Sequence, residues 1–359
     1  MKQINHIDLY LSKTYIEDLV STAQDVTDIK SLCGSSILIT GCTGTIGSWL
    51  ADTLILYNEL NAADMKIILA GRNIKRMKAH FEKCPTTPPD YVYYDLGEAP
   101  EWDFPVDYII HAAGNAHPAA FNGDPCGTIT GNILGTWNLL KYGLDHGCKR
   151  FLYISTGEVY GQGDLSLESF EETNGGYVDS TSPRSSYPNS KRAAETLCAS
   201  FTAQYGMETV IVRPSHTYGP CITPTDSRAN VQFLKNGFDG TDIVMKSAGT
   251  QERSYTYVAD CASAALTVLL KGKKGNAYNS AVPEARATIA EFAQEVAKAS
   301  GTKVIFADPT AADLANRTPI AKQVLSSAKT ESLGWRGRYD VKTGISHTLK
   351  IWHESHCEN

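Results

Sequence analysis

The sequence lacks the features that mark several classes of protein. No apolar run approaches the ~20 residues that a membrane-spanning helix needs. The residues from Met1 to Asp8 lack the apolar core and small-residue cleavage site of a signal peptide. Cationic residues are not in excess, since the formal net charge is −6, which argues against a nucleic-acid-binding surface. We therefore expect a cytoplasmic protein that binds neither membranes nor nucleic acid.

Paired spacings for metals or disulfides are also missing. The nine cysteines are scattered, their number is odd, and no C-x-x-C pattern occurs. We interpret them as reduced thiols that mostly pack inside the protein, and we expect no zinc site. With 359 residues, of which 42% are apolar and 20% charged, the chain has the composition of a globular protein with one large domain or two ordinary ones.

Residues 40–47 form a glycine-rich loop between two recognisable segments. Gly41, Gly44 and Gly47 follow the apolar run 37–39 and precede the amphipathic run 49–57. A strand, a glycine turn and a helix in this order are typical of dinucleotide binding. The reason is that backbone N–H groups approach a pyrophosphate closely and the helix presents its positive end to that charge. An ordinary strand-to-helix turn is the alternative interpretation.

Strand-like and helix-like segments alternate from this loop onwards. The predicted strands are 66–70, 91–94, 106–110, 150–154 and 209–212, and the predicted helices are 128–147 and 186–205. Apolar strands without polar alternation, placed between helices, imply a parallel sheet covered on both faces. We therefore predict an α/β fold, a Rossmann-type doubly wound sheet with a smaller C-terminal substrate-binding portion. Ligands are expected beyond the carboxyl ends of the strands.

The chain is expected to divide into three parts. Residues 1–33 are predicted to be a helical extension, whose helix from about Lys13 to Thr27 either docks on the domain or contacts a second copy. Residues 34–214 are predicted to bind NAD(P), with residues 254–282 threaded back onto this domain. Residues 215–253 and 283–359 are predicted to form the substrate-binding portion.

The ends of the second and third strands bear on the choice of cofactor. An acidic residue commonly ends the second strand when NAD is bound, but here Arg72 stands at that end. An arginine can hold the 2′-phosphate of NADP, or it can stack on the adenine of either cofactor. Asp95, at the end of the third strand, is expected to accept from the adenine amine or to cap a helix. NAD and NADP both stay open, and Arg72 favours NADP.

Tyr187 and Lys191 lie one helical turn apart, so their side chains share a face of the predicted helix. An ammonium group beside a phenol is expected to lower the pKa of the phenol, and a phenolate is a usable general base near neutral pH. The pattern alone also fits a solvated helix face. Here it follows a glycine loop and a Ser-Thr pair at 155–156, at the end of a predicted strand. This conjunction predicts a catalytic pair.

Together these motifs resemble those of extended short-chain dehydrogenases/reductases of the NAD-dependent epimerase/dehydratase family, whose members act on nucleotide-linked sugars. The resemblance spans about residues 34–282 and is strongest to the UDP-glucuronate decarboxylase and sugar 4,6-dehydratase subgroups. The family resemblance is carried by residues 40–47, 111–113, 132 with 135–136, 154–161, 187–191, 213–214 with 218–220, and 253–260. The likeness to the decarboxylases is carried by residues 183–187, 191–198 and 226–228.

The resemblance implies a tightly bound NAD or NADP that is recycled, a nucleotide-diphosphate sugar substrate and a homodimer. It implies that Thr156 hydrogen-bonds the sugar 4-hydroxyl, that Tyr187 takes the proton of that hydroxyl, and that Lys191 holds the nicotinamide ribose. Hydride transfer from the sugar C4 then gives a 4-keto sugar, which is prepared for reaction at C5 or C6. Besides Tyr187 and Lys191, the implied cofactor contacts are Gly41, Gly44, Thr45, Ile46, Gly47, Arg72, Asp95, Leu96, Ala112, Ala113 and Pro214.

Glu158 separates the predicted subclasses. Its position resembles that of an acid in dehydratases and decarboxylases, whereas simple 4-epimerases mostly carry a non-acidic residue there. A carboxylate beside the sugar C5 suits proton transfer at that carbon, and a structural acid paired with an arginine is the alternative. If the strand continues through residue 158, the side chains of Thr156 and Glu158 point to the same side.

Four further residues are candidates for binding the substrate. His117 and His216 fall in segments that the resemblance places beside the substrate, and Arg228 and Arg253 suit a diphosphate or a sugar carboxylate. Packed neutral histidines, and for Arg228 a surface salt bridge, are the alternatives. The predicted function is oxidation of the sugar at C4 followed by dehydratase- or decarboxylase-type chemistry at C5 or C6. A nucleotide-sugar 4-epimerase and a non-catalytic NAD(P)-binding sensor are the other interpretations.

Overall fold

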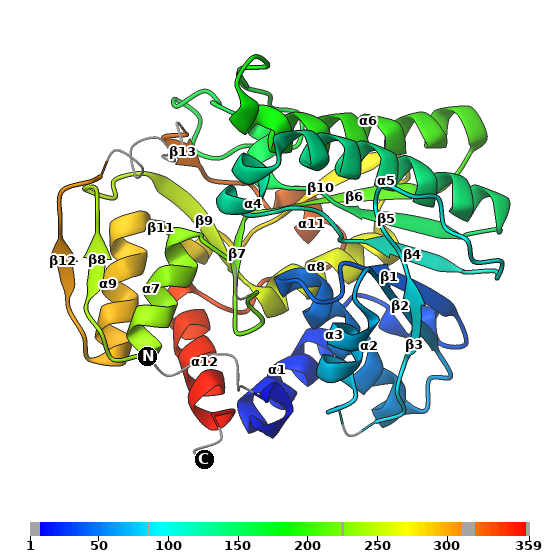
Figure 1. Ribbon diagram of the computed structural model, residues 1–359, viewed down its shortest axis with the longest axis horizontal. Coiled ribbons are helices and arrows are strands. Elements are labelled where there is room, and N and C mark those ends of the chain that lie inside the picture. Colours follow the sequence, from blue (N-terminus) through cyan, green and yellow to red (C-terminus); the bar gives the residue numbers. More distant parts are fainter. Residues whose placement is uncertain (1–7, 85, 224–225, 311–319, 357–359) are drawn as a thin grey trace.

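A seven-stranded sheet forms the centre of the molecule (Figure 1). The computed structural model describes residues 8–84, 86–223, 226–310 and 320–356. The strand order is β3-β2-β1-β4-β5-β6-β10, and every neighbouring pair is parallel. The strands are β1 Ser36–Thr40, β2 Lys66–Gly71, β3 Asp90–Tyr93, β4 Tyr108–His111, β5 Arg150–Ile154, β6 Thr209–Pro214 and β10 Asn276–Ser280. The predicted α/β fold is confirmed, and its direction of growth reverses between β1 and β4, where dinucleotides bind in such sheets.

Helices cover both faces of this sheet because its strands are apolar on both sides. Ile37 of β1 packs in one cluster with Leu54 and Leu266, whereas its neighbour Leu38 packs in a second cluster with Leu140. The first face is covered by α2 Thr45–Asn61, α3 Ile74–Phe81 and α8 Val258–Lys271, and the second by α5 Pro125–Asp145 and α6 Ser186–Tyr205. The helix predicted at 186–205 is confirmed residue for residue, and the one predicted at 128–147 begins three residues earlier and ends two earlier, as α5.

After β6 the chain builds a smaller lobe, on the left in Figure 1. β9 pairs with β7, β11 and β13, and β8 pairs with β12. The strands are β7 His216–Tyr218, β8 Ile243–Met245, β9 Glu252–Tyr257, β11 Arg286–Thr288, β12 Val304–Phe306 and β13 Lys322–Gln323, and the helices are α7 Ala229–Phe238, α9 Ile289–Ser300 and α12 Val341–Glu354. The short helix α11 Ala328–Glu331 packs instead against β10 of the main sheet. α8 and β10 return the chain to the main sheet, while the expected boundary at residue 253 falls inside β9.

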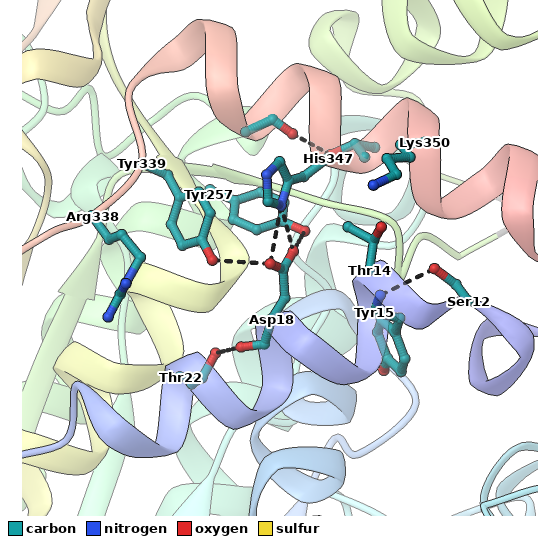
Figure 2. Close-up of polar contacts among 12 residues, drawn as sticks. Ser12, Thr14, Tyr15, Asp18, Thr22, Tyr257, Arg338, Tyr339, His347 and Lys350 are labelled. Atoms are coloured by element: carbon teal, nitrogen blue, oxygen red, sulfur yellow. Dashed lines mark hydrogen bonds and ion pairs between the residues drawn. The ribbon is translucent and has the colours of Figure 1, made fainter.

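The N-terminal extension packs against both parts of its own chain. It comprises η2 Leu9–Leu11, α1 Lys13–Gln24 and η3 Ile29–Leu32, and α1 contacts α2, α8 and α12. The buried carboxylate of Asp18 accepts hydrogen bonds from the hydroxyls of Tyr257 and Tyr339 at 2.8 and 2.9 Å, and it lies 3.0 Å from Nδ1 of His347 (Figure 2). These contacts join α1 to the end of β9 and to α12. The helix predicted in the N-terminal extension therefore docks on its own chain, as one of the two interpretations had it.

Features of other protein classes are absent from the described ranges. No helix in them has both the length and the apolarity needed to cross a membrane. No group of three or more His, Cys, Asp or Glu side chains in those ranges could hold a metal ion. Each cysteine that the structure describes is a free thiol.

Candidate active site

The carboxyl ends of β1, β4, β5 and β6 meet at one edge of the sheet, and the loops that follow them carry most of the predicted site residues. Two glycines let these loops pack closely. Gly41 has φ of +70°, and a Cβ there would lie 2.5 Å from the carbonyl carbon of Ala112. A Cβ on Gly47 would lie 2.2 Å from the oxygen of Gly41. Neither position accepts a larger residue without displacing backbone, so the loop after β1 rests directly on the loop after β4.

The first turn of α2 suits a pyrophosphate. Gly44 is the N-cap of this helix, no side chain among the described residues caps it, and its first turn contains no acidic residue. The N–H groups of the first helical residues, Thr45 and Ile46, therefore point out of the helix together with the positive end of its dipole. A Cβ on Gly44 would meet only the oxygen of Gly41, at 3.4 Å, so the backbone is accessible to a ligand. These residues fit the diphosphate of a dinucleotide.

Arg72 and Asp95 meet where the adenosine half of a dinucleotide is expected. Nε of Arg72 lies 3.8 Å from Oδ2 of Asp95, and the Arg72 side chain is 73% exposed. Oδ1 of Asp95 accepts a hydrogen bond from the Gly97 N–H at 3.0 Å, and turns follow rather than a helix. The expectation that Asp95 caps a helix is therefore wrong, because its side chain closes a turn. The adjoining Leu96 packs on α5, where a Cβ on Gly135 would lie 2.5 Å from it.

We expect the substitution Arg72→Ala to weaken NAD and NADP equally and by less than about threefold, because an exposed ion pair contributes little and the Asp95 carboxylate repels a 2′-phosphate. Calorimetric titration of cofactor-free protein with each cofactor measures this, with Lys75→Ala as the control for loss of an exposed charge. A loss of more than tenfold that is confined to NADP contradicts the expectation, since a charged contact to the phosphate is worth about 1.5–3 kcal/mol.

Tyr187 and Lys191 are buried one turn apart on α6. The Lys191 ammonium donates to the carbonyl oxygen of Ile154 at 2.8 Å and lies 4.6 Å from the ring centre of Tyr153. Burial lowers the pKa of Lys191 to about 8, and the nearby Glu195 carboxylate opposes that shift. Lys191 is thus mainly charged at pH 7 and is held against the end of β5.

The loop after β4 approaches the same lysine. A Cβ on Gly114 would lie 3.8 Å from Nζ of Lys191. The Ala113 N–H donates to the Thr40 hydroxyl at 3.3 Å, which ties this loop to the end of β1. Ala112 and Ala113 therefore lie between the glycine loop and Lys191, where the nicotinamide half of a dinucleotide would pass.

The pKa of the Tyr187 phenol is raised to about 12, first by burial and then by the charge of Glu158, while hydrogen bonding with Thr156 and the charge of Arg228 oppose the rise. Lys191 is not among the groups that shift this pKa. The expectation that Lys191 lowers the pKa of this phenol is therefore not met by the protein's own groups, among which burial has the largest effect. The groups that do act place Thr156, Glu158 and Arg228 around the phenol.

The loop after β5 differs from the extended geometry considered for it. β5 ends at Ile154, and the short 3-10 helix η4 Gly157–Tyr160 begins directly after Thr156. The Thr156 hydroxyl caps this turn by accepting a hydrogen bond from the Glu158 N–H at 3.1 Å. The prediction that an extended strand continues through residue 158 is therefore wrong. A tight turn, rather than a strand, sets the side chains of Thr156 and Glu158 beside Tyr187.

Glu158 is paired with Arg184, which was not among the predicted site residues. Nη1 and Nη2 of Arg184 lie 3.1 and 3.4 Å from the two oxygens of the Glu158 carboxylate. Arg184 belongs to η5 Pro183–Ser185, which precedes α6, and no spacing in the sequence links it to Glu158. A paired acid was the alternative interpretation of Glu158, and the pair is present. A part for Glu158 in the chemistry stays a prediction.

The four predicted substrate-binding residues lie close enough together for their charges to affect one another. Burial is the main cause that lowers the pKa of both His117 and His216. At His117 the charge of Asp226 opposes this shift and that of Arg228 adds to it, and at His216 the charges of Arg253 and Arg228 both add to it. Both histidines are therefore neutral at pH 7. Arg228 forms a salt bridge with both oxygens of Asp226, at 3.0 and 2.7 Å, so the alternative interpretation of this arginine as an ion-pair partner is also observed.

Arg253 and a residue that was not predicted, Gln323, lie side by side on β9 and β13. Arg253 is 2% exposed and bonds to backbone carbonyls, and no carboxylate among the described residues forms an ion pair with it. Nε2 of Gln323 is buried and has no hydrogen-bond partner among the residues that the structure describes. A Cβ on Gly157 would lie 3.4 Å from Cδ of Gln323 and 3.2 Å from the oxygen of Pro214. A lone glutamine carries no signal in a sequence, so only the fold reveals this donor.

Known proteins are similar to this chain over most of its length. The model of the NAD dependent epimerase/dehydratase family matches residues 37–281. UDP-glucuronic acid decarboxylase 6 of Arabidopsis thaliana is 32% identical over 315 residues, which cover 86% of this chain and 86% of that protein. UDP-glucuronic acid decarboxylase 1 of Xenopus tropicalis is 29% identical over 319 residues, which cover 87% of this chain and 71% of that protein.

Solved structures share the fold. DesIV, a dTDP-glucose 4,6-dehydratase from Streptomyces venezuelae with NAD bound, superimposes with a TM-score of 0.76 at 22% identity, over 89% of this chain and 97% of that chain. The UDP-glucose 4-epimerase of Thermus thermophilus in complex with NAD superimposes with a TM-score of 0.72 at 24% identity, over 89% and 99% of the two chains. With a glycine loop that fits a dinucleotide and a family model that matches most of its length, this chain belongs to the NAD-dependent epimerase/dehydratase family.

Proposed function

We propose that the chain oxidises a nucleotide-linked sugar at C4 with NAD and then acts at C5 or C6, as a decarboxylase or a dehydratase. The observation that carries this proposal is the turn after β5, which sets Thr156 and Glu158 beside the phenol of Tyr187. A hydroxyl and a phenol suit proton transfer at one carbon, and a carboxylate next to them suits the adjoining carbon. The curated relatives named as UDP-glucuronic acid decarboxylases support the same substrate class.

The first step needs one proton and one hydride to leave the sugar. Tyr187 takes the proton of the 4-hydroxyl, and Thr156 holds that hydroxyl by a hydrogen bond. NAD, when bound, supplies the acceptor for the C4 hydrogen and its electron pair, so that C4 becomes a ketone. The Lys191 ammonium, which donates to the Ile154 carbonyl, would hold the nicotinamide ribose when the cofactor is bound.

The second step uses the ketone as an electron sink. In a dehydration, Glu158 takes the C5 proton, and the electron pair of that bond expels the C6 hydroxyl group, which gains a proton and leaves as water. In a decarboxylation, the C5–C6 bond breaks, its electrons pass toward the 4-ketone, carbon dioxide leaves, and the resulting enolate gains a proton at C5. In either case, return of the hydrogen and its electron pair to the sugar would leave the cofactor oxidised again, which fits a cofactor that is recycled.

Two cations, Arg228 and Arg253, suit the rest of the substrate. Arg253 is a buried guanidinium without a carboxylate partner among the described residues, so a diphosphate or a sugar carboxylate supplies the charge that it lacks. The buried amide of Gln323 adds a donor on the same side. The neutral ring of His216, which lies within the influence of the charges of Arg253 and Arg228, offers a hydrogen bond without adding charge.

A nucleotide-sugar 4-epimerase is the second candidate. The ion pair between Glu158 and Arg184 favours it, since a carboxylate held by an arginine can be structural. A non-catalytic sensor is less consistent with the site, because Thr156, Tyr187 and Lys191 are all present and close together.

Incubation of the purified protein with a panel of nucleotide sugars tests the proposal. Mass spectrometry of the products distinguishes loss of carbon dioxide, loss of water and no change in mass, and chromatography detects an epimer of unchanged mass. We expect one of the two losses. A product of unchanged mass supports the epimerase, and the absence of any product with every sugar contradicts an enzymatic function of this type.

We also propose that the protein is a homodimer through the exposed apolar face of α5. Ile129, Leu134 and Trp137 on α5 are large apolar side chains that are exposed in the single chain. The substitution Leu134→Lys is expected to convert the dimer to a monomer, because a lysine at that face must be desolvated on association. Light scattering coupled to gel filtration measures the mass, with Leu60→Lys on the exposed end of α2 as the matched control. A wild-type mass equal to that of one chain contradicts this proposal.

A further inference from the structure

A buried phenylalanine contacts two groups that border the proposed reaction centre. Phe121 lies on the short helix α4 Pro118–Gly123 and is fully buried. Its ring stacks on the ring of Tyr187, with the centroids 5.1 Å apart and the planes 7° from parallel. The guanidinium carbon of Arg184 lies 5.4 Å from the same Phe121 ring centre. One aromatic side chain thus touches both the phenol and the arginine that holds Glu158.

The ion pair between Arg184 and Glu158 is bidentate. Two nitrogens of Arg184 face the two carboxylate oxygens at 3.1 and 3.4 Å, and both side chains are about a fifth exposed, at 23% and 22%. A planar fork of this type fixes the rotation of the carboxylate as well as its position. Partial burial reduces solvent screening, so each charge acts on its neighbours more strongly than at an open surface.

We propose that Arg184 and Phe121 are positioning residues that couple the two reaction centres: Arg184 orients Glu158 and offsets its charge, and Phe121 joins that ion pair to the ring of Tyr187. This inference rests on the proposed function, because it concerns the groups assigned there to C4 and C5. The four residues come from four separate elements, η4, η5, α4 and α6, and they form a continuous chain of contacts.

The charges around the phenol show why Arg184 matters for its protonation. Glu158 opposes ionisation of Tyr187, while Arg228 favours it. Lys191 is bound to a carbonyl nearby, and Arg253 lies within the field of Glu158. Arg184 is the cation in direct contact with the Glu158 carboxylate. Without it the negative charge faces the phenol with less compensation, and Tyr187 should need a higher pH to act as a base.

The first test removes the charge of Arg184. We expect Arg184→Gln to move the midpoint of the pH dependence of NAD reduction, followed at 340 nm after mixing with the nucleotide sugar, upward by about one pH unit. Arg184→Lys keeps the charge but not the fork, so the midpoint should stay and the rate should fall. In a Glu158→Gln background the change Arg184→Gln should not move the midpoint, because the charge that it offsets is gone. An unchanged midpoint in Arg184→Gln, or an equal shift in both backgrounds, overturns the proposal.

The second test concerns the ring. Phe121→Leu should slow NAD reduction by about 10- to 100-fold at every pH, since a small displacement of a reacting group costs this much, while Phe121→Tyr should retain most of the rate. The cofactor content and the melting temperature of each variant show that it is folded. A rate for Phe121→Leu within twofold of the wild type overturns the part assigned to Phe121.

A measurement without substrate separates this inference from the proposed function. The 13Cζ resonance of Tyr187, assigned with Tyr187→Phe, reports ionisation of the phenol in the holoenzyme as the pH is raised. If no nucleotide sugar reduces the cofactor but Arg184→Gln still delays this titration, the proposed function fails and the electrostatic part for Arg184 stands. If sugars reduce the cofactor normally and neither the kinetic nor the spectroscopic midpoint moves, the function stands and the inference is overturned.

Discussion

Replacement of Tyr187 by phenylalanine is expected to abolish reduction of the bound cofactor while leaving the fold and the cofactor content unchanged. The phenol is the group that receives the proton of the sugar 4-hydroxyl in the proposed reaction, and loss of a positioned base typically costs about 10²–10⁴-fold in rate. The phenylalanine ring keeps the stacking on Phe121, so the packing around residue 187 is preserved. Only the hydroxyl, and with it the proton acceptor, is removed.

The rate is measured as the increase in absorbance at 340 nm after mixing with the sugar that the panel identifies. Tyr205→Phe on the exposed end of the same helix is the matched control, and it should react like the wild type. Turnover by Tyr187→Phe within tenfold of the wild-type rate contradicts the assignment of the base. A second outcome, loss of bound cofactor from the variant, assigns Tyr187 to cofactor binding instead.

Replacement of Glu158 by glutamine should separate the two steps of the reaction. The change keeps the size of the side chain and removes the group proposed to act at C5. Cofactor reduction at C4 should therefore continue, while the later steps slow by about 10²–10⁴-fold. The variant should accumulate reduced cofactor, visible at 340 nm, together with a bound 4-keto sugar that mass spectrometry identifies after denaturation. Removal of the carboxylate charge also lowers the pKa of Tyr187, because Glu158 raises that pKa in the wild type. The phenolate is then easier to form, which favours cofactor reduction at C4.

Glu168→Gln, an exposed acid in the loop that follows η4, is the control for loss of a negative charge. If Glu158→Gln forms product at nearly the wild-type rate and with unchanged mass, the protein is a 4-epimerase and the Glu158–Arg184 pair is structural. If the variant neither reduces the cofactor nor binds it, Glu158 is needed for the architecture of the site rather than for one step.

Local patterns were sufficient for the framework of the fold. The helix predicted at 186–205 matches α6, because its apolar spacing is helical and Gly206 in a left-handed conformation ends it. The apolar strands predicted a parallel sheet, since Ile37 and Leu38 can both be buried only if both faces are covered. The extents of these elements depend on neighbouring residues, which a sequence displays directly.

Predictions that needed distant groups were less successful. Lys191 was expected to set the pKa of Tyr187, but burial dominates, and the ammonium bonds to the carbonyl of Ile154, which is 37 residues away in the chain. The alternative in which Asp95 caps a helix is wrong, because its carboxylate closes a turn and pairs with Arg72, whereas its contact with adenine stays a prediction. An extended strand was expected to carry Thr156 and Glu158, whereas the chain turns directly after Thr156.

The sequence by itself determined the glycine loop, the tyrosine and lysine one turn apart, and the family to which the chain belongs. These features depend on spacings of a few residues, within one turn or one strand. Only the tertiary structure decided which partners these groups have. Arg184 pairs with Glu158, which is 26 residues away in the sequence. Asp18 of the N-terminal helix accepts a hydrogen bond from the hydroxyl of Tyr339, which is 321 residues away. Such contacts form when separate elements pack, and burial and charge at a site are sums over all of those elements, so no local pattern contains them.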